Sequence, residues 1–335
     1  MDSVKMDSVK VDEIMELRPL GQTEIKISVV ALGCWPIAGM TSPGVTDEDS
    51  IATIQACHDL GINHLDTAYA YGRTGESERL IARAIEGRRD SVVIATKGGL
   101  HWDAQGMQAH DARPETLRRQ CEESLRRLGT DRVELYYLHA PDRNVPLAES
   151  AGAIRDLIAA GKVRAAGASN VSAAELEQFA AVCPLAAYQP PYNMLQRQIE
   201  ADTLPWCRQH GVSVLAYWPL AKGLLAGKMS RDETFAPTDS RRKYPMFQGD
   251  EWRKNHDLLD KLREIAAASG RSVAQTVINW TIHQPGITAA LCGAKRPDQI
   301  IENAGGAGWE LTAAQRTLID QVLVERGMPA VRYPV

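Results

Sequence analysis

Short apolar runs rich in β-branched residues alternate with longer amphipathic segments along most of the chain. The short runs predict strands at residues 29–33, 64–68, 91–97, 133–139, 163–169, 186–189, 213–218 and 287–293. The segments between them predict helices at residues 47–60, 76–85, 114–128, 147–160, 173–182, 201–210 and 252–268. Glycines that follow "HDL", "IAA" and "RQH" mark the ends of three of these helices.

Eight predicted strands, each followed by a helix and with no change of composition between the halves, indicate a parallel (β/α)8 TIM barrel. A doubly wound sheet is the main alternative, but it would need a G-x-G-x-x-G fingerprint, which is absent. The stretch "MELRPLGQTEIKISVV" predicts an N-terminal β-hairpin that turns near Gly21. A stretch of mixed composition at about 220–250 predicts a long functional loop after strand seven, and we expect a C-terminal helix.

Residues 15–335 are expected to form this single domain, because residues 1–14 contain "MDSVKMDSVK", a duplication that does not continue. We interpret residues 1–14 as a disordered tail or a duplicated start.

The net charge of −4, with both signs interleaved, argues against nucleic-acid binding. Without an apolar run of about 20 residues or a secretory signal, we expect a cytoplasmic protein that does not span a membrane. Six dispersed cysteines and scattered histidines predict reduced thiols and no metal site. The sequence leaves the oligomeric state open.

Polar residues of the kinds that catalysis uses stand at the carboxyl ends of several predicted strands. In a barrel these ends meet at one face, where active sites are built. Alone, each residue has an ordinary explanation, such as a turn-forming aspartate or a solvated lysine. Their convergence from separate strands predicts one site, made of Asp66, Tyr71, Lys97, His139, Ser169, Asn170 and Gln189.

The chemistry of these side chains predicts proton donation to a carbonyl oxygen. A tyrosine has a pKa near 10, and we expect the Lys97 ammonium to lower the pKa of Tyr71. Asp66 would keep Lys97 charged, and His139 would orient the carbonyl oxygen. The attacking group would be a cofactor hydride. A Schiff-base aldolase that uses Lys97 is an alternative enzyme class.

Seven stretches in order carry a family resemblance: "LDTAYAYG", "ATKGG", "ELYYLHAPD", "GKVRAAGASN", "YQPPYNML", "AYWPLAKGLLAGK" and "CGAKRPDQIIEN". From about residue 15 to the final helix, the chain resembles an aldo-keto reductase. Its motifs are most similar to those of bacterial members grouped with the general stress protein of Bacillus type. The resemblance implies a catalytic tetrad of Asp66, Tyr71, Lys97 and His139, with Tyr71 rather than Tyr69 as the proton donor.

The same resemblance implies a nicotinamide cofactor. The residues expected near its nicotinamide end are Gly33, Cys34, Trp35, Ser169, Asn170, Gln189 and Tyr217. Those expected over the pyrophosphate are Leu220, Lys222 and Gly223, and those at the adenosine end are Gly293, Lys295, Arg296, Gln299 and Asn303. Two cations at the start of a helix favour a phosphate dianion, so we expect NADPH rather than NADH.

The expected substrate contacts are Trp35, Tyr71, Trp102 and His139. Trp218 and Cys34 depart from the residues common in the family, and Trp35, Trp102 and Trp218 could form an aromatic wall suited to apolar carbonyls. We therefore expect NADPH-dependent reduction of small aldehydes or ketones to alcohols. The alternatives are an NAD-dependent aldose or alcohol dehydrogenase, and a cofactor-binding redox-sensing subunit with little turnover.

Overall fold

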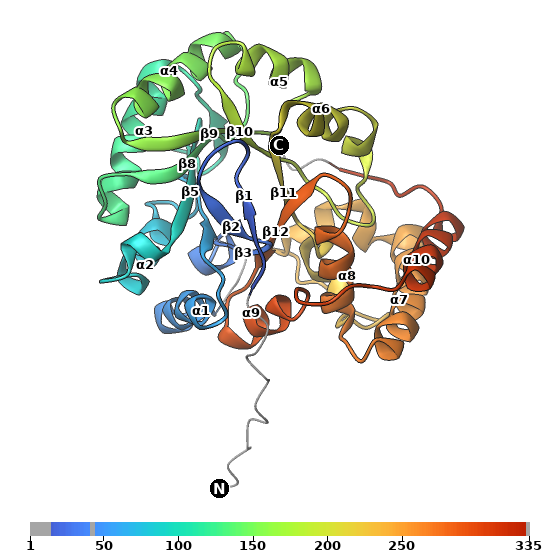
Figure 1. Ribbon diagram of the computed structural model, residues 1–335. Coiled ribbons are helices and arrows are strands. Elements are labelled where there is room, and N and C mark those ends of the chain that lie inside the picture. Colours follow the sequence, from blue (N-terminus) through green and yellow to red (C-terminus); the bar gives the residue numbers. More distant parts are fainter. Residues whose placement is uncertain (1–14, 41–43, 333–335) are drawn as a thin grey trace, which may run out of the picture.

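The protein forms a closed barrel of eight parallel strands with a hairpin across one end (Figure 1). The computed structural model describes residues 15–40 and 44–332. The hairpin consists of β1 (Leu17–Pro19) and β2 (Lys26–Ser28), which pair antiparallel. The barrel strands are β3 (Val30–Gly33), β4 (His64–Asp66), β5 (Val93–Gly98), β8 (Val133–Leu138), β9 (Val163–Ser169), β10 (Leu185–Gln189), β11 (Ser213–Tyr217) and β12 (Ile287–Gly293). The predicted fold class is confirmed.

Helices surround the barrel as the alternating pattern predicts (Figure 1). They are α1 (Asp47–Asp59), α2 (Glu76–Ala84), α3 (Pro114–Leu128), α4 (Leu147–Ala159), α5 (Ala173–Ala180), α6 (Thr203–His210), α8 (Val273–Ile282) and α9 (Pro297–Ala304). Two more helices, α7 (Gly249–Ala268) and α10 (Ala313–Arg326), pack against each other beside this ring. The sequence pattern missed α8, although Ser272 and Gln275 form a reciprocal capping box at its start.

The hairpin fills the end of the barrel at which the strands begin. Leu20 and Ile27 are fully buried and belong to the same apolar cluster as the small barrel-interior residues. Gly21 has φ +57°, and a Cβ there would lie 2.5 Å from the carbonyl oxygen of Ala186, so the turn requires glycine. The Gly21 amide also donates to Oγ of Ser213, 2.8 Å away, at the start of β11. This packing leaves the carboxyl ends of the strands for chemistry.

Several boundaries differ from the sequence pattern because the chain turns at the strand ends. The predicted strand 64–68 ends at Asp66, and a turn follows in which the Tyr71 amide donates to the carbonyl oxygen of Ala68, 3.0 Å away. β11 ends before Trp218, whose φ is +58°. The stretch 220–250 contains 3-10 turns at Ala221–Ala226, Ser240–Lys243 and Pro245–Phe247. A second hairpin, β6 (Leu100–Trp102) with β7 (Gln108–His110), was not predicted.

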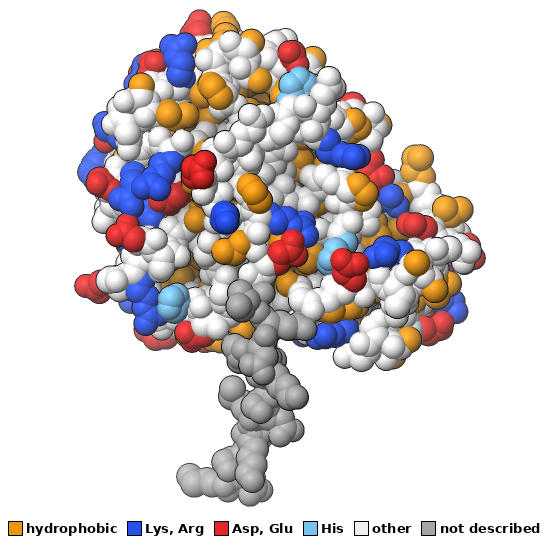
Figure 2. Space-filling model, in the orientation of Figure 1, with side chains coloured by type: hydrophobic (Ala, Val, Ile, Leu, Met, Phe, Trp, Pro, Cys, Tyr) orange, Lys and Arg blue, Asp and Glu red, His pale blue; other side chains and the backbone are white. Residues whose placement is uncertain are grey.

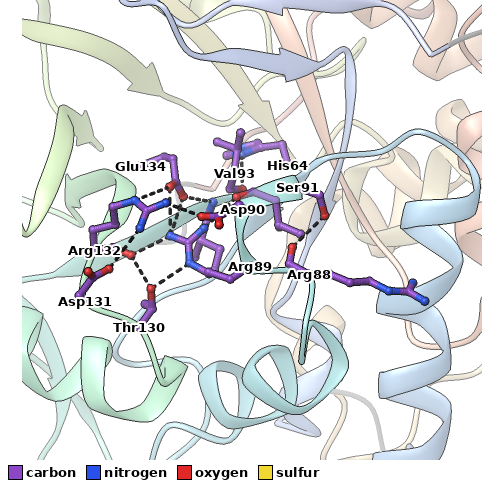
Figure 3. Close-up of polar contacts among 12 residues, drawn as sticks. His64, Arg88, Arg89, Asp90, Ser91, Val93, Thr130, Asp131, Arg132 and Glu134 are labelled. Atoms are coloured by element: carbon purple, nitrogen blue, oxygen red, sulfur yellow. Dashed lines mark hydrogen bonds and ion pairs between the residues drawn. The ribbon is translucent and has the colours of Figure 1, made fainter.

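A charged cluster ties β5 to β8 near their starts (Figure 3). Nη2 of Arg89 donates to both carboxylate oxygens of Glu134, at 3.0 and 2.9 Å, and also to the carbonyl oxygen of Arg132, at 2.7 Å. Oε2 of Glu134 in turn accepts from the backbone amide of Ile94, 2.9 Å away. Because Glu134 is buried, this hydrogen-bonded pairing stabilises a carboxylate that would otherwise be costly to hold there.

The outer surface carries mixed charges. Figure 2 shows basic and acidic side chains interspersed over the face that the hairpin occupies. All six cysteines are buried and unpaired. Among the described residues, no helix is long and apolar enough to cross a membrane, and no group of three or more metal-ligating side chains occurs. The tail predicted at residues 1–14 lies outside the described residues, and the single domain over residues 15–335 remains a prediction.

Candidate active site

The strand ends predicted to carry chemistry do meet at one end of the barrel. In the strand register, Gly33 pairs with Asp66, and Ser169 pairs with Gln189. Side chains alternate along β5, so Ala95 and Lys97 both point into the barrel. Ala95 belongs to the barrel core, and Lys97 lies nearer the carboxyl end of the strand. His139 follows directly after β8, and its backbone amide bonds to the carbonyl oxygen of Gly98, 2.8 Å away.

Lys97 is the centre of the site. Its side chain is 1% exposed, and its Nζ donates to Oδ1 of Asp66 at 2.6 Å, to the carbonyl oxygen of Thr67 at 2.8 Å, and to the Tyr71 hydroxyl at 3.2 Å. These three acceptors match the three N–H groups of an ammonium. The other oxygen of Asp66 accepts from Nε2 of Gln189 at 2.7 Å. The ammonium and the carboxylate are therefore both paired and hydrogen-bonded, which a buried pair requires.

Aromatic rings surround the Tyr71 phenol. The ring of Trp35 meets that of Tyr71 edge-on, with centroids 5.1 Å apart, and the His139 ring lies 5.9 Å away on another side. Nζ of Lys97 stands 4.7 Å from the Tyr71 ring centroid. Nδ1 of His139 is buried and has no hydrogen-bond partner in the described part of the chain. The four residues of the predicted tetrad are thus brought together.

Burial controls the protonation of this cluster. Desolvation lowers the pKa of Lys97, while the neighbouring Asp66 carboxylate acts in the opposite direction and favours the ammonium. Desolvation and the nearby Lys97 charge lower the pKa of His139 well below its usual value, so the imidazole is neutral at pH 7. The pKa of Tyr71 is raised well above its usual value, first by desolvation and then by the Asp66 charge.

The expectation that Lys97 lowers the pKa of Tyr71 is therefore wrong for the free protein. The physical reason is that burial desolvates the phenolate and the Asp66 carboxylate adds to the rise. Tyr71 consequently remains a neutral phenol and retains a proton that it can donate. A neutral imidazole beside a protonated phenol and a fixed ammonium can bind an electronegative oxygen and protonate it. The buried, fully bonded Lys97 amine gives little support to the aldolase alternative.

Comparisons with known proteins agree with this geometry. The model of the Aldo/keto reductase family matches residues 29–324. The chain belongs to the aldo/keto reductase family. It is 38% identical to the aldo-keto reductase YhdN of Bacillus subtilis (strain 168), over 92% of this chain and 94% of that protein. It is 32% identical to an NADH-specific methylglyoxal reductase of Escherichia coli (strain K12), over 92% and 98%.

Solved structures of the family show the same fold. The glycerol dehydrogenase AKR11B4 from Gluconobacter oxydans has a TM-score of 0.87 and 37% identity, covering 97% of this chain and 99% of that one. The holo form of aldo-keto reductase AKR11C1 from Bacillus halodurans has a TM-score of 0.76 and 26% identity, over 96% and 98%. The chain is thus an oxidoreductase of the aldo/keto reductase family that acts on small carbonyl compounds.

Ser169 and Asn170 place polar groups beside the ring of Tyr217, an arrangement that fits a nicotinamide, which is a flat ring bearing an amide. Oγ of Ser169 donates to the carbonyl oxygen of Gln189 at 2.7 Å. Nδ2 of Asn170 donates to the carbonyl oxygen of His139 at 2.9 Å, and its Oδ1 accepts from the Tyr217 hydroxyl at 2.9 Å. Asn170 has φ +57°, so the chain leaves β9 in a left-handed turn that directs this amide across the barrel end. The half-buried Tyr217 ring is thereby fixed as a flat surface.

The first loop, which is predicted to lie near cofactor and substrate, contacts the tetrad through its backbone. The Cys34 amide donates to the carbonyl oxygen of Asp66 at 2.8 Å, and Gly33 pairs in register with Gly293 on its other side. The Cys34 thiol is fully buried, and desolvation raises its pKa well above its usual value. The thiol is therefore a neutral packing group beside Asp66.

The predicted pyrophosphate loop opens with an unusual backbone. Lys222 has φ +58° and Gly223 has φ +92°. Nζ of Lys222 lies 4.2 Å from the ring centroid of Trp218 and 4.7 Å from that of Tyr244. Desolvation, followed by the charge of Arg241, lowers the pKa of Lys222 to about 8. Tyr244 was missed, because it is distant in sequence from Lys222 and no local pattern links them.

The residues predicted for the adenosine end lie at the end of β12 and on the first turns of α9. The Lys295 amide donates to Oε1 of Gln299 at 2.9 Å, and Nδ2 of Asn303 reaches back to the carbonyl oxygen of Gly293 at 3.5 Å. Nε of Arg296, however, lies 3.4 Å from Oδ1 of Asp298. Part of the positive charge expected to select a 2′-phosphate is therefore balanced within the protein.

Two further residues extend the site. Trp102, a predicted substrate contact, lies on the unpredicted β6–β7 hairpin and donates from Nε1 to the carbonyl oxygen of Ala70 at 2.9 Å. Its indole is thus tied to the residue beside Tyr71. Tyr137 was missed. It is fully buried, and Nζ of Lys97 lies 5.8 Å from its ring centroid. The alternation along 133–139 could have revealed it, because Tyr137 and His139 share a face.

Proposed function

We propose that this protein reduces small aldehydes or ketones to alcohols with NADPH, and that Tyr71 is the general acid. The observation that supports this most strongly is the position of the Tyr71 hydroxyl, 3.2 Å from a Lys97 ammonium that is itself held by Asp66. A phenol in this position can protonate an oxygen while a neighbouring cation stabilises the phenolate that results. Its raised pKa keeps the proton on Tyr71 until the substrate oxygen becomes basic.

The chain's own residues can perform each proton-handling step. His139, neutral at pH 7, can donate one N–H to the substrate carbonyl oxygen and hold it near the Tyr71 hydroxyl. A reduced nicotinamide, when bound, supplies the hydride that adds to the carbonyl carbon. As negative charge develops on the oxygen, the O–H bond of Tyr71 breaks and the proton completes the alcohol. Lys97 stabilises the phenolate until it takes up a proton from water.

A cofactor-consumption assay tests the reaction class. Purified protein is mixed with NADPH or NADH and with aromatic aldehydes, sugars, methylglyoxal or pyridoxal, and the reduced cofactor is followed by absorbance. We expect consumption with at least one aldehyde and a matching amount of alcohol product. Tight cofactor binding with no turnover on any of these compounds would instead support a redox-sensing subunit.

The preference for NADPH rests on Lys295 and Arg296 at the start of α9. In the Lys295→Ala/Arg296→Ala double variant, we expect NADPH to lose more affinity than NADH. Asp298→Asn is the matched variant, because it frees Arg296 from its ion pair. It should tighten NADPH binding and leave NADH binding nearly unchanged. Equal losses for both cofactors in the double variant would show that these cations do not contact a 2′-phosphate.

A second candidate is oxidation of an alcohol or aldose with NAD. It is favoured by the resemblance to a structure named as a glycerol dehydrogenase and to a relative named NADH-specific. The Arg296–Asp298 ion pair points the same way, because it leaves less charge for a 2′-phosphate. In this direction Tyr71 would act as a base, by microscopic reversibility. Rates measured with glycerol and NAD and with an aldehyde and NADPH, each at several pH values, separate the two candidates.

A further inference from the structure

A buried ionic cluster lies behind the segment that carries Tyr71. Thr96, next to Lys97 on β5, donates from Oγ1 to Oε1 of Glu78 at 2.8 Å. Glu78 lies on α2 and is fully buried. Its other oxygen accepts from Nη1 of Arg127 on α3, 3.2 Å away. Glu78 therefore links the strand that carries Lys97 to the helix that carries Arg127.

Arg127 also contacts the Tyr71 segment directly, through Tyr69. Its Nη1 donates to the carbonyl oxygen of Tyr69 at 3.3 Å, and its guanidinium carbon lies 4.3 Å from the Tyr69 ring centroid. The Tyr69 hydroxyl donates to Oε2 of Glu123, one turn earlier on α3, at 2.7 Å. Gly75 leaves the space that the Arg127 side chain fills, because a Cβ there would lie 2.5 Å from Cδ of Arg127. Tyr69 is thus held at its backbone, ring face and hydroxyl.

The same segment is bonded to the strand of Lys97. The Tyr69 amide donates to the carbonyl oxygen of Lys97 at 3.0 Å, and Tyr71 follows two residues later in a turn closed by its own amide. The distance between the Tyr71 hydroxyl and the Lys97 ammonium therefore depends on where Tyr69 is held. A displacement of about 1 Å in a catalytic group can cost about a hundredfold in rate.

We propose that Arg127 and Glu78 are positioning residues that fix the Tyr71 phenol against Lys97, an inference that rests on the proposed role of Tyr71 as proton donor. Neither residue touches the reacting atoms. Their loss should lower kcat with little change in cofactor affinity, because the contacts of Arg127 are with Glu78, Glu123 and Tyr69, and none of these is proposed to hold the nicotinamide. A merely structural role would instead lower the amount of folded protein and leave kcat per folded molecule unchanged.

The surface allows a test by chemical rescue. A hollow of about 490 Å³, lined by Thr74, Arg79, Glu123, Arg126 and Arg127, opens onto the cluster. Small cations can therefore reach the space left in Arg127→Ala. We expect this variant to lose kcat by about tenfold to a hundredfold, and guanidinium chloride at low millimolar concentration to restore part of the loss. Arg126→Ala is the matched control, because Arg126 is the exposed neighbour on the same helix. It should keep the wild-type kcat and not respond to guanidinium.

A double variant separates positioning from stability. Arg127→Ala leaves the buried Glu78 carboxylate unpaired, which destabilises the fold. In Arg127→Ala/Glu78→Gln that charge is gone, so the melting temperature should recover while kcat stays low. Recovery of kcat together with the melting temperature, or a wild-type kcat in Arg127→Ala, would overturn the inference.

Tyr71→Phe, measured in the same assay, separates this inference from the proposed function. An inactive Tyr71→Phe beside a fully active Arg127→Ala removes only the positioning role. An active Tyr71→Phe removes the proposed donor itself.

Discussion

Two opposite charges, a phenol and a neutral imidazole make up the site at the scale of single residues. Asp66 and Lys97 are almost completely buried, yet every N–H of the ammonium has an acceptor within 3.2 Å. The carboxylate thus opposes the desolvation that lowers the pKa of Lys97. Tyr71 remains protonated because burial, and after it the Asp66 charge, raises its pKa. The site therefore holds an acid whose conjugate base has a stabilising cation in reach.

The protonation of Lys222 predicts that cofactor affinity depends on pH. Its pKa is lowered to about 8, so the ammonium is present below pH 8 and is lost as the pH rises through that value. If Lys222 binds the cofactor pyrophosphate, cofactor affinity should fall between pH 7 and pH 9. Lys222→Arg should remove this fall, because a guanidinium stays charged. Titration of protein fluorescence with NADPH at both pH values measures the effect, and an equal decline in Lys222→Arg would contradict the assignment.

At the scale of elements, the strands divide the barrel into a structural end and a chemical end. Near the starts of β5 and β8, Glu134 on β8 accepts from the Ile94 amide on β5 and from Arg89 in the turn before β5 (Figure 3). At the carboxyl ends, the same two strands present Lys97 and His139. A substitution near the strand starts should therefore affect stability, and a substitution at the carboxyl ends should affect turnover.

Arg89→Met tests this division. It removes the closer of the two guanidinium partners of the buried Glu134 and leaves Arg132 at 3.9 Å and the Ile94 amide. We therefore expect a loss of up to about 3 kcal/mol in the free energy of unfolding. At a temperature where the variant is folded, kcat should stay close to the wild-type value. Asp131→Asn, in the same cluster but with an 87% exposed side chain, should change stability by no more than about 0.5 kcal/mol. Urea unfolding measures both, and equal stabilities for the two variants would show that the buried pair contributes little.

At the scale of the whole molecule, the alternation of strands and helices was enough to predict the barrel and its chemical end. Lys97 and His139 could be placed because strand period and barrel topology together direct them to one face. The conformation of Trp218 could not be predicted. Its backbone lies in the left-handed region, with φ +58°, because of tertiary packing, and no local sequence signal indicates this. Tyr244 joins Lys222 only through the folded loop. The predicted lowering of the Tyr71 pKa is wrong in direction, because the burial that raises this pKa depends on tertiary packing and not on neighbouring residues in the sequence.

The central claim is that the Tyr71 hydroxyl delivers the proton, and a single-turnover experiment on Tyr71→Phe tests it most directly. Enzyme already loaded with reduced cofactor is mixed with an aldehyde that the wild type reduces, and the loss of reduced cofactor is followed in a stopped-flow instrument. We predict a rate at least about a hundredfold below the wild type, with the cofactor dissociation constant nearly unchanged. A Tyr71→Phe protein that reduces the aldehyde at the wild-type rate would contradict the account.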